Sequence, residues 1–233
     1  MNFPQTNWTQ LRDASLNGDT RGRQALEAMC EAYRAPVIGF LRLRGYHANV
    51  AEDLAHQFYL ELMEKQAWQR ADRAKGRFRT FLLGILMNVL SCERQRAGAE
   101  KRGAGVTPLS LDELESNGHE ISAGEESWQF DRQWALGLVA SALAGTEASV
   151  RDAGRGREWP VLVRFLPGSG APPAYEDAMA ELGMTLPALK SAVNRVRQGF
   201  REELRRAVSI TVSAPHEIDE ELAYLRDVLT KVI

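Results

Sequence analysis

The chain has 233 residues, of which 44% are hydrophobic and 26% charged, with a formal net charge of −2 at pH 7. This length allows one large domain or two small ones, and the hydrophobic content argues against wholesale disorder. No stretch reaches the roughly 18 apolar residues of a membrane helix, and we expect no secretory signal. Cys30 and Cys92 have no Cys or His at ligand spacing, so we expect no metal site, no disulfide framework and a cytoplasmic location.

The charged residues are unevenly distributed along the chain. Residues 70–106 contain nine Lys or Arg against three acids, and residues 187–206 contain six against two. Between them, residues 107–131 contain seven acids and no Lys or Arg. Two basic segments joined by an acidic connector are typical of two nucleic-acid contacts on a tether. Solvated helix faces are the alternative that charge alone leaves open.

Apolar residues at three- and four-residue steps predict an all-α fold. The first helix covers residues 22–44; Pro36 either bends it or marks a break, and Gly45 ends it. The next helix covers residues 49–64 and has a predicted buried stripe formed by Val50, Leu54, Phe58 and Leu62. Its other side is polar and mostly acidic, with Asp53, Gln57, Glu61 and Glu64.

A basic connector that ends Lys75-Gly76-Arg77 precedes a third helix, from Phe78 to about Gln95. This helix is apolar over most of its circumference, so we expect it to be largely buried. At its start, Phe78 lies between Arg77 and Arg79, and such a group offers the stacking and phosphate contacts that suit single-stranded DNA. Packing in the core is the alternative for the aromatic residues, and we favour it for Phe81.

Residues 103–124 are predicted to be a linker, after which an apolar section leads to a loop at residues 167–173. A short helix over residues 175–182, a tight turn at Gly183 and a helix to about residue 208 follow, with Thr185 as a possible cap. Ala178 and Leu182 can pack against the second of these helices, as in a helix-turn-helix motif whose second helix enters the major groove. A structural helical hairpin is the alternative.

The outward residues of that second helix would be Thr185, Ala188, Lys190, Ser191, Asn194, Arg195 and Arg197. Lys and Arg can contact phosphates or guanine, and Asn can read adenine. A final amphipathic helix has an apolar face formed by Ile218, Leu222, Leu225 and Leu229. This face needs a partner surface, so the helix is either a structural cap or folds back on the helix-turn-helix or its loop and modulates access to DNA or to a protein partner.

The order of these segments resembles that of extracytoplasmic-function sigma factors, the smallest members of the sigma-70 superfamily, over nearly the whole chain. Residues 51–62 resemble the region-2 helix that binds the β′ clamp helices of RNA polymerase; this implies core-polymerase binding by Asp53 and Gln57, with Glu61 on the same face. Residues 76–88 resemble the promoter-melting segment. The implied minus-ten DNA-binding residues are Lys75, Arg77, Phe78, Arg79, Asn88, Arg94 and Arg96. Residues 185–197 resemble the region-4 helix that reads the minus-thirty-five element as duplex.

The resemblance implies two small helical domains: region 2 over residues 1–103 and region 4 over residues 128–210. An acidic linker over 104–127 joins them, and a C-terminal helix over 211–233 follows. The implied partners are core RNA polymerase, through its β′ clamp helices and β flap, and promoter DNA; an anti-sigma factor is a further partner that the family allows. No membrane, metal or cofactor is implied. Cys92 stands where the family usually has an acid, and Ala188-Leu189 replace a common Thr-Val, so no promoter preference is implied.

Two other classes of function fit the sequence less well. A helix-turn-helix regulator that acts without polymerase needs neither the acidic stripe nor the basic, aromatic segment, and the chain has both. An enzyme would need a phosphate-binding glycine loop, a nucleophile with a base, metal-ligand spacing or paired carboxylates, and the sequence offers none that stands out. We therefore expect no enzymatic activity.

Overall fold

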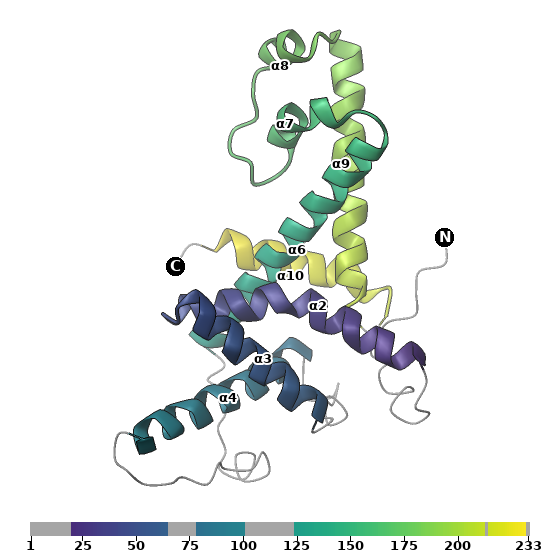
Figure 1. Ribbon diagram of the computed structural model, residues 1–233. Helices are drawn as coiled ribbons and strands as arrows, with labels where there is room; N and C mark the ends of the chain where they lie inside the picture. Colours follow the sequence, from purple (N-terminus) through teal and green to yellow (C-terminus); the bar gives the residue numbers. More distant parts are fainter. Residues whose placement is uncertain (1–19, 65–77, 101–123, 213, 232–233) are drawn as a thin grey trace.

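The computed structural model describes residues 20–64, 78–100, 124–212 and 214–231 (Figure 1). Every regular element in these ranges is helical, which confirms the all-α prediction. The elements are α2 (Thr20–Leu43), α3 (Ala48–Glu64), α4 (Phe78–Glu100), α6 (Glu125–Asp152), η3 (Gly156–Glu158), α7 (Trp159–Leu162), η4 (Val163–Phe165), α8 (Tyr175–Leu182), α9 (Leu186–Ser209) and α10 (Glu217–Thr230). None of these helices has both the length and the hydropathy needed to cross a membrane.

Helix α2 runs without a break through Pro36 and ends where the sequence predicts. Gly45 has φ +88°, a left-handed conformation that favours glycine and stops the helix. The ring of Pro36 lies against α6: a Cβ atom placed on Gly137 would be 3.2 Å from Pro36 Cγ. A larger residue at position 137 would force the two helices apart, so this glycine allows α2 and α6 to cross closely.

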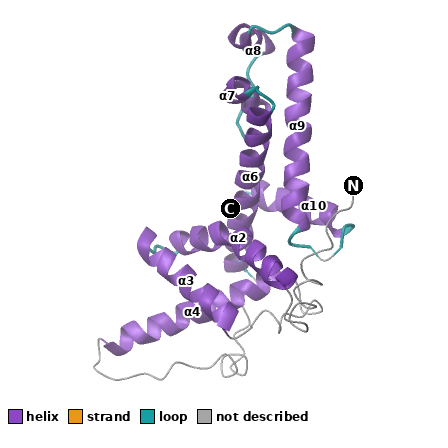
Figure 2. Ribbon diagram, turned by 45° about the vertical axis from the view of Figure 1, so that its right-hand side comes forward, coloured by secondary structure: helices purple, strands orange, loops and turns teal. Residues whose placement is uncertain are grey.

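Helices α6 and α9 are long and lie side by side (Figure 2). They have 28 and 24 residues, which at about 1.5 Å per residue corresponds to lengths of about 42 and 36 Å. At one end of this pair α7 and α8 pack against them, and at the other end lie α2, α3, α4 and α10 (Figure 1). The pair therefore connects α7 and α8 at one end with the group formed by α2, α3, α4 and α10 at the other.

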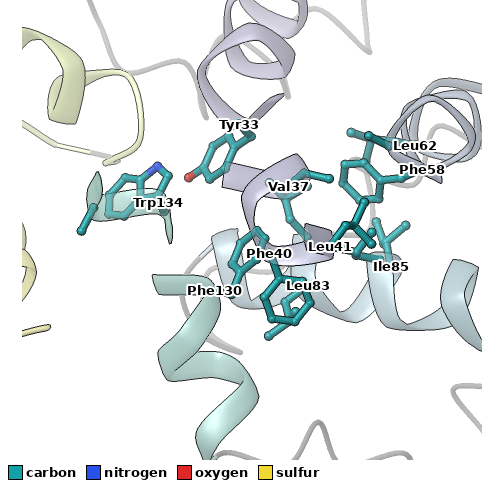
Figure 3. Close-up of a cluster of buried hydrophobic side chains, with 14 of the residues drawn as sticks. Tyr33, Val37, Phe40, Leu41, Phe58, Leu62, Leu83, Ile85, Phe130 and Trp134 are labelled. Atoms are coloured by element: carbon teal, nitrogen blue, oxygen red, sulfur yellow. The ribbon is translucent and has the colours of Figure 1, made fainter. Parts of the chain in front are cut away.

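The buried apolar side chains form two clusters, which we call the lower and upper cores. The lower core contains residues of α2, α3 and α4, the first half of α6, the end of α9 and α10. Its largest side chains include Phe40 and Phe130, whose rings meet edge to face at 5.5 Å, and Tyr33, which stacks on Trp134 (Figure 3). The upper core contains the second half of α6, α7, η4, α8 and most of α9.

The C-terminal helix belongs to the lower core. Ile218 and Leu225 of α10 are 2% and 4% exposed and pack in the same cluster as α2 and α4. The apolar face predicted for this segment is therefore real, and its main partner is α6, with α9 beside it. Because α6, α9 and α10 all contribute to the lower core, the core formed by the predicted region-2 helices extends beyond residue 103. The predicted linker lies outside the described residues up to residue 123.

Candidate nucleic-acid and protein-binding surfaces

The predicted helix-turn-helix consists of α8, a tight turn and α9. Gly183 has φ +64°, and the amide of Met184 donates to the carbonyl of Met179 at 3.1 Å across the turn. Ala178 and Leu189, one from each helix, are completely buried where α8 and α9 meet. The small side chain and the left-handed turn thus set the geometry of the two helices, as the sequence predicts.

The predicted DNA-facing residues of α9 lie on its outer face, with one exception. Thr185 occupies the N-cap position, although its hydroxyl makes no capping hydrogen bond. The exposed residues are Thr185, Ala188, Lys190, Ser191, Asn194 and Arg195. These side chains lie opposite the buried face of α9, so a duplex could approach them without any rearrangement of the upper core.

Arg197 is the exception. Its side chain is half-buried, and its Nε donates a hydrogen bond to the backbone carbonyl of Phe165 at 3.1 Å. This bond ties the middle of α9 to the end of η4. Arg197 therefore stabilises the upper core in this structure, instead of pointing outward with Lys190 and Arg195.

Helix α3 presents a polar outer face. Asp53 and Gln57 are exposed and Glu61 is half-buried. The opposite side of the helix is buried against α2 and α4 through Leu54, Phe58 and Leu62. The structure thus leaves the predicted partner-binding residues on the surface.

The predicted buried stripe of α3 is wrong at Val50, which is 44% exposed. Steps of four residues advance about 400° around a helix, so a stripe of four such positions drifts by about 120° from first to last. Val50 consequently lies at the edge of the outer face. Leu60 and Met63, 44% and 40% exposed, add further apolar area to this side of the helix.

The predicted minus-ten residues are less well grouped. Arg94 and Arg96 are exposed on the second half of α4, and Asn88 is half-buried. Phe78 begins α4 as predicted. Lys75 and Arg77 lie outside the described residues, as does the side chain of Phe78.

Arg79 departs most from its predicted role, because it is 3% exposed. Its Nε donates to Asp131 Oδ1 at 2.6 Å, and its Nη1 forms an ion pair with Glu221. The other carboxylate oxygen of Asp131 accepts a hydrogen bond from the hydroxyl of Tyr224. We call these four residues the Arg79 cluster. The structure thus places the Arg79 guanidinium in the core instead of on an exposed surface, and its role in binding the minus-ten strand stays a prediction.

The charge of Arg79 is retained in this buried site. Burial acts to lower the pKa of Arg79, but the carboxylates of Asp131 and Glu221 outweigh that effect and hold the pKa above its usual value. The guanidinium also lies over two aromatic rings, with its central carbon 4.3 Å from the Trp134 centroid and 5.0 Å from that of Tyr224. The cluster thus joins α4, α6 and α10 around one cation.

Helical spacing in the sequence indicates that the charged residues of this cluster are buried. Counting charges over the basic and acidic segments does not reveal this. Arg79 stands three, four and seven residues before Leu82, Leu83 and Leu86, all buried, so it lies on the apolar side of α4. By the same spacing, Glu221 shares a helix face with Ile218, Leu225 and Val228, and Asp131 shares one with Ala135 and Leu138. One cation and two acids on buried faces have to meet, because unpaired buried charges are strongly destabilising.

Comparison with known proteins adds no identification: no family model matches the chain, and neither the curated proteins nor the solved structures include a significant match.

Proposed function

We propose that this chain is a bacterial sigma factor of the extracytoplasmic-function type, which binds core RNA polymerase and directs it to promoter DNA. The observation that carries the proposal is the separation of two exposed surfaces. An acidic face with apolar residues lies on α3, and the basic outer face of a helix-turn-helix lies near the start of α9, at the opposite end of the long helix pair (Figure 1).

The α3 surface suits a protein partner. Asp53 and Gln57 lie between the exposed apolar side chains Val50 and Leu60 along one side of the helix. Acidic side chains repel DNA, whereas exposed apolar area beside polar groups is typical of protein interfaces. In the proposed function this face binds the β′ clamp helices, and Glu61 borders the contact.

The α9 surface suits duplex DNA. Lys190 and Arg195 can contact phosphates or guanine, and Asn194, one residue before Arg195, can read adenine. In the proposed function these residues recognise the minus-thirty-five element, while the exposed Arg94 and Arg96 of α4 contribute to the minus-ten element. The protein acts by positioning polymerase and DNA, without covalent chemistry.

Capture of core polymerase tests this function. The tagged full chain should retain purified core enzyme, and Asp53→Arg should abolish retention because it reverses the charge at the centre of the α3 surface. Asp152→Arg, the same charge reversal at an exposed position at the end of α6, is the matched control and should retain the enzyme.

Arg195→Glu supplies the complementary test. It should leave core capture unchanged and impair transcription from a promoter that carries an upstream duplex element. A chain that binds duplex DNA tightly by itself and ignores core enzyme would instead be a helix-turn-helix regulator that acts without polymerase.

A further inference from the structure

The C-terminal helix α10 carries an excess of acids over its whole length. Between Glu217 and Thr230 it has five acidic residues and a single Arg. Two of these acids pair with arginines of other helices: Glu221 binds Arg79 at the start of α4, and the exposed Asp219 binds Arg205 of α9. The second pair holds the pKa of the Asp219 carboxyl below its usual value through the hydrogen bond from Arg205. Helix α10 thus places carboxylates on cations from two basic segments.

The contact with Arg79 reproduces the chemistry of a phosphate contact. A guanidinium binds carboxylate and phosphate oxygens through the same N–H donors, and the two anions compete for it. Arg79 is the second residue of α4 and lies in the segment predicted to bind the melted minus-ten strand. Glu221 therefore occupies the Nη1 side of a cation that single-stranded DNA would use in the proposed function, and Asp131 of α6 occupies its Nε side.

The buried arrangement leaves the cation incompletely satisfied. Among the described residues, Nη2 of Arg79 is buried and has no hydrogen-bond partner, although Nε and Nη1 are both paired. A buried polar group without a partner is destabilising, and exposure to water or phosphate removes that penalty. Ion clusters of this kind are less stabilising than apolar packing but can be separated in water, which is what a switch requires.

Apolar contacts determine how firmly α10 is held. Ile218 and Leu225 are buried in the lower core, whereas Glu220 and Asp219 are exposed. The helix therefore binds through one apolar edge and through the Arg79 cluster, with the exposed Asp219–Arg205 pair as a weaker contact. Weakening either contact should release it while the rest of the lower core, built from α2, α3, α4 and α6, keeps its packing.

We propose that α10 is an intramolecular competitor of nucleic acid: in the closed chain Glu221 of α10 holds Nη1 of Arg79 while Asp131 of α6 holds Nε, and single-stranded DNA reaches the Nη groups of Arg79 only when α10 is displaced. The inference rests on the proposed function in one respect, because it takes the start of α4 as the minus-ten surface. It adds a regulated state, in which the free chain has low affinity for single strands until a partner or the promoter opens it.

Fluorescence anisotropy with a labelled single-stranded oligonucleotide of mixed sequence tests the charge contact in the full chain. Glu221→Gln should raise the affinity about five- to tenfold, in the range typical of coupling between competing sites. Glu220→Gln makes the same change in net charge at an exposed position of α10 and should change the affinity less than about twofold. Equal gains in both variants would reduce the effect to net charge and overturn the inference.

A second pair of variants separates release of α10 from general destabilisation. Leu225→Ala and Leu62→Ala each remove a buried leucine from the lower core, the first in α10 and the second in α3. Only Leu225→Ala should raise the affinity for the single strand. A rise in both, or in neither, contradicts the inference.

Hydrogen exchange of the wild-type chain keeps the test independent of variant folding. Addition of the same oligonucleotide should accelerate exchange of the amides of residues 217–230, and unchanged or slower exchange there would exclude displacement of α10. Failure of core-polymerase capture would reject the proposed function and leave these results intact. Conversely, retained capture with no release of α10 would reject this inference alone.

Discussion

Helices α4 and α9 both begin in segments predicted to bind DNA, and the structure treats their cations in opposite ways. Lys190 and Arg195 of α9 are exposed, whereas Arg79 of α4 is almost completely buried. The number of basic residues does not explain this difference. It follows from how each helix is packed.

Near its start, α9 packs on one side only. Its buried stripe is formed by Leu189, Ala192, Val193 and Val196, and the positions on the other side face solvent. Helix α4 is enclosed more completely, because Ile85 and Val89 are buried in addition to Leu82, Leu83, Leu86 and Leu90 and widen its buried arc. A cation beside such a broad buried face is itself buried unless its long side chain reaches water. For Arg79, the carboxylates of Asp131 and Glu221 compensate the cost of burying its charge.

The two helices also differ in where their partners come from. Arg79 is paired with residues 52 and 142 positions further along the chain, whereas Arg197 reaches a carbonyl 32 positions earlier and Arg195 faces solvent. Exposure of a cation therefore depends on distant residues where a helix lies in the middle of a core. On the outer face of α9, local periodicity predicts the exposure of Lys190 and Arg195, but not the contact of Arg197 with the Phe165 carbonyl.

Arg79→Ala should have the largest effect on stability. It leaves the carboxylates of Asp131 and Glu221 buried without their cation, which should lower the free energy of unfolding by about 3–5 kcal/mol. Urea denaturation followed by circular dichroism measures the change. Arg195→Ala, the exposed counterpart on α9, should stay within about 0.5 kcal/mol of the wild type. A loss below about 1 kcal/mol for Arg79→Ala would mean that the cluster does not form in solution.

Arg197→Ala should have a smaller effect that distinguishes two arginines of one helix. The substitution removes the hydrogen bond to the Phe165 carbonyl and should cost about 1–2 kcal/mol, since the site is only half-buried. The same denaturation experiment measures it against Arg195→Ala. Equal stabilities of the two variants would place Arg197 on the DNA-facing side after all.

Much of the fold follows from local signals in the sequence. The bounds of α8 agree with the prediction at both ends, and the turn at Gly183 and the packing of Ala178 against α9 are as expected. These features depend on residues close together in the chain, where helical spacing and turn chemistry decide the outcome. The outer faces of α3 and α9 were predictable for the same reason.

The features that sequence reasoning missed depend on long-range packing. The spacing of Arg79 relative to the leucines of α4 indicates its burial, but only the fold brings Asp131 and Glu221 to it. Similarly, the apolar face of α10 was evident, whereas its position on α6 and in the lower core was not. Periodicity identifies a face that needs a partner, and it does not identify the partner.

The smallest expected effect concerns the turn that orients α9. Gly183→Ala places a side chain at φ +64°, which disfavours the native state by about 1 kcal/mol and is partly offset by the reduced entropy of the unfolded chain, for a net loss of about 0.5–1 kcal/mol. Gly199→Ala is the matched control within the same motif. A Cβ atom at that position meets only Thr146 Cγ2, at 3.7 Å, so the higher helix propensity of alanine should stabilise the protein by up to about 1 kcal/mol. The midpoint temperature of thermal unfolding should therefore fall for Gly183→Ala and rise for Gly199→Ala. A shift in the same direction for both variants would mean that residue 183 does not hold the left-handed turn on which the outward direction of Lys190 and Arg195 depends.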